Sequence, residues 1–296
     1  MKLIKLTIFN HLTGWNFKDL CFDYLTLLVG ASGVGKTQIL RTIKDVASIA
    51  RGKSINGLEW NVIFEIDTIE YRWCGEFAKI LEDDISIVEG EKKNYSIVWE
   101  SLYRGGVLVV NRGDEQIFLN REKTVKLDPT KSAISLLKEV DTIKPVYEAF
   151  AQISELKNDD DGIHVSPFFS KNSDNLKDIN DVRNNRMLDP IEKLFLLRKN
   201  GFEEFETIKQ LFIEVFPLVE DIDFSLETVF NGLLCPILKI KERGVDTWIM
   251  QNKMSSGMIR TLVQITFLIL AQDGDIVLID EFENGLGVNC IDKLAD

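Results

Sequence analysis

Residues 30–37 read G-A-S-G-V-G-K-T, a set of residue types and a spacing that bind phosphate. The three glycines let the backbone turn tightly, so that its N–H groups point inward at phosphate oxygens. Lys36 can reach the β- and γ-phosphates of a nucleotide, and the Thr37 hydroxyl can bind Mg²⁺. A nucleoside triphosphate site is therefore predicted. Its expected nucleotide-binding residues are Gly30, Ala31, Ser32, Gly33, Val34, Gly35, Lys36, Thr37 and Gln38.

The segments on either side of this loop must position it. Leu25–Val29 is apolar and is expected to form a buried strand, and Gln38–Ile43 is expected to open a helix. The N-terminus of a helix adds a fixed positive dipole at the point where phosphate would bind. A glycine-rich turn without a ligand is the alternative, and the flanking strand and helix disfavour it.

A second set of chemical groups lies near the C-terminus. Ile276–Ile279 is an apolar run followed directly by Asp280 and Glu281. Such a run is typical of a buried parallel strand, which would deliver its acids at the edge beside the phosphate loop. Asp280 would then hold Mg²⁺ through water, and Glu281 would orient or deprotonate the attacking water. The alternative is a core strand with an ordinary acidic end.

Small residues precede the last predicted helix. Met254–Met258 reads M-S-S-G-M, and its free N–H groups at a helix start would suit an anion. A simple N-cap by Ser255 or Ser256 explains the serines equally well. Both interpretations stay open at this point.

The composition is that of a globular protein with no predicted membrane partner. The chain has 296 residues and a net charge of −12, and no apolar run approaches the roughly 18 residues that cross a bilayer. The acidic balance does not indicate nucleic acid as a partner, although a local basic groove would be compatible with it. Four scattered cysteines and two distant histidines indicate neither a zinc site nor a disulfide framework, which fits a reducing cytoplasm.

Periodicity gives a coarse map of the remaining elements. Expected strands are Leu3–Phe9, Asn61–Ile66, Ile69–Cys74, Ile85–Val88, Tyr95–Trp99 and Val107–Val110, with hairpin turns at Asp67-Thr68 and Gly105-Gly106. Expected helices are Ser132–Val140, Ile143–Leu156, Pro190–Leu197, Glu203–Phe216 and Ile259–Gln272. Pro236–Lys241 and Val245–Met250 should form a further hairpin. Residues 158–189 are rich in Asn and Asp and are expected to form a long surface loop.

The order of these motifs resembles the ABC-type P-loop ATPases of the SMC, RecF and OLD-like group. Met254–Met258 would align with the L-S-G-G-Q signature of that group, so Ser255, Ser256 and Gly257 would contact the nucleotide of a partner subunit. Residues 280–287, D-E-F-E-N-G-L-G, are closest to the small ATPases of prokaryotic anti-phage systems. The resemblance covers roughly residues 1–45 and 236–296 and matches the middle only in its layout.

Several departures from the pattern bear on catalysis. No histidine follows Glu281, whereas the group usually has a switch histidine there, so turnover is in question. The chain ends at Asp296, where two more strands are expected, which predicts a shortened C-terminal lobe. Gln116 is poorly placed for the Q-loop glutamine, and the arginine often found near Phe9–Thr13 is missing.

The resemblance implies an α/β fold, with a P-loop ABC-type core, an antiparallel β lobe and a helical insertion. The expected domains are an N-terminal ATPase lobe over residues 1–130, a helical insertion over 131–225 and a C-terminal ATPase lobe over 226–296. The interval between Lys36 and Ser255 is longer than in transporter domains and holds no long coiled coil.

The resemblance also implies a function. ATP and Mg²⁺ would bind between the subunits of a head-to-tail dimer or a larger even assembly. The cycle would act as a conformational switch in a Septu-, retron- or PARIS-type defence system that controls a separate effector nuclease or other defence protein. A RecF-like DNA-repair ATPase and a nucleotide-dependent scaffold with little hydrolysis are the alternatives.

Overall fold

The structure is a computed structural model in which the chain forms two compact units. It describes residues 1–31, 33–81, 94–113, 116–156, 176–185, 187–228 and 234–282. The first unit comprises residues 1–155 and 273–278, and the second comprises residues 156–272 and 279–296. Each unit has its own hydrophobic core and is described by itself.

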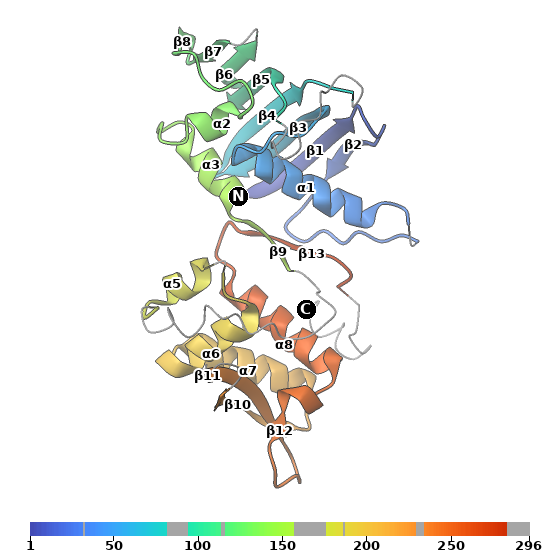
Figure 1. The fold of residues 1–296 in the computed structure, drawn as a ribbon, viewed down its shortest axis with the longest axis vertical. Coiled ribbons are helices and arrows are strands. Elements are labelled where there is room, and N and C mark those ends of the chain that lie inside the picture. Colours follow the sequence, from blue (N-terminus) through green and yellow to red (C-terminus); the bar gives the residue numbers. More distant parts are fainter. Residues whose placement is uncertain are drawn as a thin grey trace. The chain divides into compact units, whose positions relative to one another are not determined.

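An antiparallel sheet of eight strands forms the first unit (Figure 1). Its strands are β1 (Lys2–Asn10), β2 (Asn16–Cys21), β3 (Leu58–Ile66), β4 (Ile69–Phe77), β5 (Ile97–Arg104), β6 (Val107–Gly113), β7 (Gln116–Leu119) and β8 (Glu122–Lys123). They lie in the order β2-β1-β3-β4-β5-β6-β7-β8. Two further strands, β9 (Ile153–Leu156) and β13 (Ile276–Ile279), pair with each other in a separate sheet.

Three helices cover one face of this sheet: α1 (Lys36–Ala50), α2 (Ala133–Leu136) and α3 (Lys144–Ala151). Strand β3 alternates strictly, so that Leu58, Trp60, Val62 and Phe64 are buried toward the helices while the residues between them face away. The ring of Phe150 in α3 lies 5.1 Å from the ring of Phe64. Within the described residues of this unit, helices therefore cover one face of the sheet and not the other.

The two predicted hairpin turns are confirmed. Asp67 and Thr68 join β3 to β4 and have φ of 49° and 66°, and Gly105 and Gly106 join β5 to β6 with φ of 53° and 79°. Two successive residues with positive φ form the turn whose twist matches that of the flanking antiparallel strands. Local turn chemistry was therefore sufficient to predict these connections. The strand expected at Ile85–Val88 lies outside the described residues.

Among its described residues, the second unit has four helices and a small antiparallel sheet. The helices are α5 (Ile179–Asn184), α6 (Pro190–Asn200), α7 (Glu203–Val215) and α8 (Ser256–Leu270), with a short 3₁₀ helix at Gln251–Lys253. The sheet has the order β10-β11-β12, with strands β10 (Val219–Thr228), β11 (Leu234–Glu242) and β12 (Ile249–Met250). Helix α6 begins with a capping box formed by Asp189 and Glu192, and it ends at Gly201 in the left-handed region.

The prediction of a buried strand at Leu25–Val29 was wrong. These residues are not in a strand, and the side chains of Leu25, Leu27 and Val29 are 81%, 76% and 83% exposed. A strand needs a neighbour for its backbone N–H and C=O groups, and no described strand pairs with this segment. Thr26 within the segment bonds instead to Asp23, with the Thr26 hydroxyl donating to the Asp23 carbonyl.

Other element boundaries also differ from the predictions. The helix expected to run to Leu156 ends at Ala151, and residues 153–156 form β9 because they find β13 as a neighbour. The helix expected over Ser132–Val140 is reduced to α2. Part of the expected loop over residues 158–189 is helix α5, capped by Asp178, and residues 157–175 lie outside the described residues. Within the described residues, no helix is long and apolar enough to cross a membrane.

Candidate functional site

The phosphate loop belongs to the first unit and leads directly into α1. Gly33 and Gly35 have φ of 82° and 98°, in the left-handed region that side chains other than glycine rarely adopt. Gly30 has no room for a side chain, because a Cβ there would lie 2.9 Å from a methyl carbon of Val34. The three glycines therefore shape a turn that a substituted loop would not adopt without strain. Ser32 lies outside the described residues.

The side chain of Lys36 is folded back across the loop. Its ammonium donates hydrogen bonds to the backbone carbonyls of Gly30, at 2.6 Å, and Ala31, at 3.2 Å. These bonds hold a full positive charge against the turn. The cation is thus already located where the loop would hold a phosphate group.

The N-terminus of α1 is arranged to accept an anion. Gly35 is its N-cap, so no N-cap side chain occupies the first N–H groups, and the first turn contains no acidic residue. Unpaired N–H groups at a helix start, together with the helix dipole, favour negative charge. Thr37 and Gln38 follow Lys36 in this first turn and are half-buried. Lys36 and the start of α1 therefore present positive potential at the same place.

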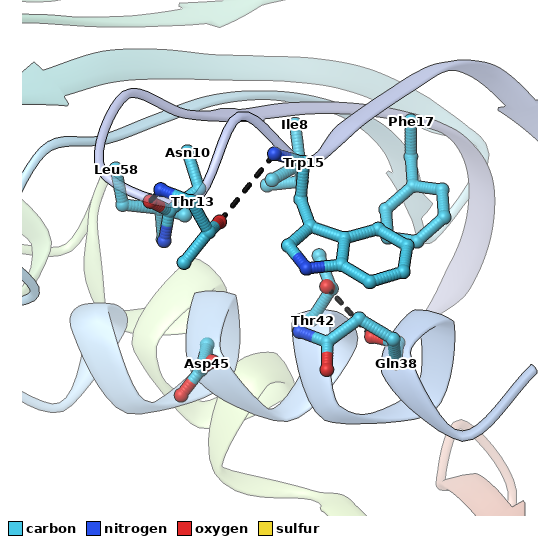
Figure 2. Close-up of a pocket in the computed structure, with 9 residues that line it drawn as sticks. All are labelled: Ile8, Asn10, Thr13, Trp15, Phe17, Gln38, Thr42, Asp45 and Leu58. Carbon is cyan, nitrogen blue, oxygen red and sulfur yellow. Dashed lines mark hydrogen bonds between the residues drawn. The ribbon is translucent and has the colours of Figure 1, made fainter. Parts of the chain in front are cut away.

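Two aromatic rings flank this turn, and they were missed in the sequence. Trp15 and Phe17 stack with ring centroids 5.6 Å apart, and a Cβ on Gly35 would lie 3.4 Å from the Trp15 ring. Together with Gln38 and Thr42 of α1 they line a pocket of about 150 Å³ (Figure 2). The ring of Trp15 is 44% exposed. Aromatic residues at alternate positions, just before a phosphate loop, were the signal available in the sequence.

Ser255 is the N-cap of α8 in the second unit. Its hydroxyl accepts a hydrogen bond from the Met258 backbone N–H at 3.2 Å, while Ser256 begins the helix. The Gly257 carbonyl accepts a bond from the Thr261 hydroxyl at 2.9 Å. The capping interpretation of these serines is therefore confirmed. A signature contact with a partner subunit stays a prediction.

Asp280 and Glu281 directly follow β13, as predicted. Asp280 is half-buried, and one of its carboxylate oxygens accepts a bond from the Glu281 backbone N–H at 3.1 Å. Glu281 is exposed and has a φ of 50°, which is uncommon for a residue with a side chain. Backbone strain of this kind is concentrated at functional sites. The side chain of Gln264 in α8 donates to the next carbonyl, that of Phe282, at 3.3 Å and so ties this turn to the helix.

The predicted site residues thus form two groups. The phosphate loop with Gln38 lies in the first unit, whereas the Ser255–Gly257 segment, Asp280 and Glu281 lie in the second. The chain passes between the units three times: after Glu155 within β9, after Gln272, and after Leu278 within β13. Residues 283–287, which resemble the D-loop, lie outside the described residues.

Comparison with known proteins identifies the family. Residues 25–296 match the family described as "AAA domain, putative AbiEii toxin, Type IV TA system". The chain belongs to this AAA family. The matched range contains both the phosphate loop and the Asp280-Glu281 pair. The predicted α/β P-loop NTPase fold is therefore confirmed, and this AAA protein is a P-loop ATPase with a nucleotide-binding loop.

The other comparisons add a structural similarity at low sequence identity. No curated protein matches the sequence. Among solved structures, it is similar to an Smc head domain with an extended coiled coil from Pyrococcus furiosus, which is bound to the C-terminal domain of ScpA. The identity is 14% and the TM-score is 0.45, and the match covers 100% of this chain and 85% of that chain.

Proposed function

We propose that this AAA protein binds ATP with Mg²⁺ at Gly30–Gln38, hydrolyses it, and uses the cycle as a conformational switch. One observation carries the proposal: Lys36 is bonded across a turn whose glycines adopt positive φ, at the start of α1, where the first turn has no acidic residue. A cation and free N–H groups at one point match the charge and geometry of a polyphosphate.

The residues expected to hold Mg²⁺ have suitable chemistry. The Thr37 hydroxyl and the Asp280 carboxylate are hard oxygen donors, the type that Mg²⁺ prefers. When bound, Mg²⁺ would neutralise charge on the β- and γ-phosphates. Glu281 follows Asp280 and is exposed, so its carboxylate is accessible to a water molecule. In this proposal Glu281 orients that water or accepts its proton.

The pocket beside α1 offers a binding place for the adenine base of ATP in this proposal. Trp15 presents a half-exposed ring that is held by stacking on Phe17 and lies against Gly35 at the end of the phosphate loop. Aromatic faces stack with nucleobases largely without regard to base identity. In this proposal the base lies on Trp15 while Lys36 binds the phosphates.

The biological setting is proposed from the family and the motifs. The family description names a putative toxin of a type IV toxin–antitoxin system, which supports a role in a system of more than one component. We propose that two copies associate head to tail around ATP, with Ser255, Ser256 and Gly257 of one copy facing the phosphate loop of the other. The assembly would then control a separate effector in an anti-phage defence system.

The experiment that tests hydrolysis compares ATP turnover in wild type, Glu281→Gln and Glu220→Gln. Glutamine keeps the shape of Glu281 but cannot accept a proton, so turnover should fall by about 10²–10⁴-fold while ATP binding persists. Glu220 is an exposed glutamate of the same unit, and its substitution should change neither. Asp280→Asn should instead weaken binding of Mg²⁺ and hence of ATP.

Two results would contradict parts of this proposal. Equal turnover in wild type and Glu281→Gln would show that Glu281 is not the catalytic carboxylate. ATP binding without turnover in wild type would favour the nucleotide-dependent scaffold over the ATPase switch. Repeating the assay with duplex DNA separates the repair alternative, because only that function predicts stimulation by DNA.

A further inference from the structure

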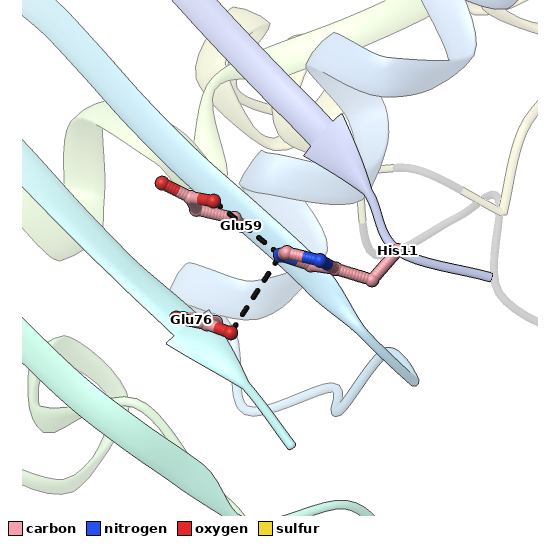
Figure 3. Close-up of side chains that lie close together, drawn as sticks. All are labelled: His11, Glu59 and Glu76. Carbon is pink, nitrogen blue, oxygen red and sulfur yellow. Dashed lines mark ion pairs between the residues drawn. The ribbon is translucent and has the colours of Figure 1, made fainter. Parts of the chain in front are cut away.

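Three ligand-type side chains meet on the face of the large sheet that faces away from α1. His11 directly follows β1, Glu59 lies in β3 and Glu76 lies in β4 (Figure 3). Glu59 alternates with the helix-facing residues Leu58 and Trp60, which places it on the opposite face. The three residues are far apart in the sequence, and only the pairing of three strands brings them together.

The two glutamates occupy an unfavourable arrangement without a cation. Glu59 and Glu76 are direct partners in the pairing of β3 with β4. Like charges directly opposite each other in an antiparallel pair are destabilising. Both carboxylates nevertheless approach the imidazole of His11, and one ligand atom from each residue lies within 4.8 Å of the other two. A positive charge at the centre of this triad would remove the repulsion.

The distances fit coordination better than direct hydrogen bonding. His11 Nε2 lies 3.4 Å from a Glu59 oxygen and 3.6 Å from a Glu76 oxygen, whereas charge-assisted hydrogen bonds are about 2.7–2.9 Å long. Ligand atoms about 2.0–2.2 Å from a tetrahedral cation lie about 3.4 Å from one another. His11 Nε2 is also buried and has no hydrogen-bond partner in the described structure. An imidazole nitrogen with this surrounding has an unused lone pair or proton.

Neighbouring groups hold two of the ligands in place. Trp99 donates from its indole N–H to the second oxygen of Glu76 at 3.0 Å, which leaves the first oxygen directed at His11. The His11 backbone N–H donates to the Gly57 carbonyl at 2.8 Å, and the His11 ring packs edge-on against Phe9 at 4.3 Å. Such outer contacts orient metal ligands and raise their affinity.

We propose that His11, Glu59 and Glu76 bind a first-row divalent metal ion such as Zn²⁺ or Mn²⁺. One imidazole nitrogen and two carboxylate oxygens suit these ions, and water would complete the coordination. The cation fastens the end of β1 to β3 and β4. This site is separate from the nucleotide site, because α1 and its phosphate loop lie on the other side of the sheet.

Isothermal titration of the full, EDTA-treated chain with Zn²⁺ and, separately, Mn²⁺ tests the proposal. Wild type should bind one equivalent of at least one of these ions at this site. His11→Gln and Glu76→Gln should each weaken that binding by more than about 100-fold, since each removes a ligand, and Trp99→Phe by about 10-fold, since it removes only an orienting bond. Glu70→Gln is the matched control, because Glu70 faces Glu65 in the same two strands without a histidine.

Thermal unfolding provides a second readout that does not depend on the variants being as stable as wild type. A cation that binds only the folded chain stabilises it by an amount that grows with cation concentration. The melting temperature of wild type and Glu70→Gln should rise with the ion, and that of Glu76→Gln should not. Binding unaltered by His11→Gln and Glu76→Gln, or no binding in wild type, would overturn the proposal and leave the triad a histidine–carboxylate ion pair.

Discussion

At the scale of single residues, the nucleotide site depends on a few groups with defined geometry. Lys36 is held by two loop carbonyls, and Gly35 adopts a φ of 98° at the start of α1. Trp15 lies against this glycine with a half-exposed ring. In the proposed site, phosphate contacts and the base contact fall on different residues, so experiment can separate them.

Trp15→Ala should weaken ATP binding by roughly 5- to 100-fold, because stacking on an aromatic ring contributes about 1–3 kcal/mol per base. Binding of inorganic tripolyphosphate should be unchanged, since it has no base to stack. Titration calorimetry with both ligands measures the difference. Trp248→Ala is the control, because Trp248 is also partly exposed but lies in the second unit. If Trp15→Ala lowers the affinity for ATP and for tripolyphosphate equally, Trp15 supports the phosphate loop rather than binding the base.

The candidate site residues that the sequence pointed to are those whose chemistry is local. The phosphate loop could be read from eight consecutive residues, and Asp280 and Glu281 from the apolar run before them. Trp15 could not be assigned from its own neighbours, because its contact with Gly35 depends on how the β1–β2 hairpin meets α1. His11 was taken as an isolated histidine, since its two glutamate neighbours lie about fifty or more positions further along the chain.

At the scale of elements, the same distinction between local and non-local interactions explains which predicted strands and helices the structure contains. Hairpins with a two-residue turn were predicted correctly, because the turn itself specifies the pairing. The strand expected at Leu25–Val29 was wrong, because an apolar run becomes a strand only when a neighbour pairs with it. Residues 153–156 show the converse: β9 follows directly on α3, and pairing with β13 overrides the continuing helical pattern.

Helix α8 provides an element-scale test of the two roles of Ser255. Ser255→Ala removes the cap on the Met258 N–H and should cost about 1 kcal/mol of stability, but it leaves space for a partner. Ser255→Arg loses the cap as well and adds a bulky cation where a second copy would place its γ-phosphate. Both variants should bind ATP, and only Ser255→Arg should lose ATP-driven association.

Light scattering with and without ATP measures this association, and thermal unfolding measures the cap. If ATP-driven association survives Ser255→Arg, the serine is a helix cap alone. If Ser255→Ala also prevents association, the partner requires the serine hydroxyl, as cap or as contact, rather than only free space around it.

At the scale of the whole molecule, the chain separates its predicted chemistry between two compact units. The first unit contributes the phosphate loop and the aromatic pocket, and the second contributes Ser255, Asp280 and Glu281. The chain passes between them in β9, after Gln272 and in β13, and Asp280 follows β13 directly. In an ATPase that acts as a switch, nucleotide bound by one unit must affect the other unit. Nucleotide binding at the phosphate loop is the first step of such a cycle.

ATP binding to wild type, Lys36→Ala and Lys53→Ala is the measurement that tests the central claim most directly. Lys36→Ala removes the cation that is bonded across the loop, so affinity for Mg-ATP should fall at least about 100-fold, given about 1.5–3 kcal/mol for each hydrogen bond to a charged group. Lys53 is exposed and paired with Asp45 at the far end of α1, so its substitution should leave affinity unchanged. Unchanged ATP affinity in a folded Lys36→Ala variant would contradict the assignment of Gly30–Gln38 as the nucleotide site.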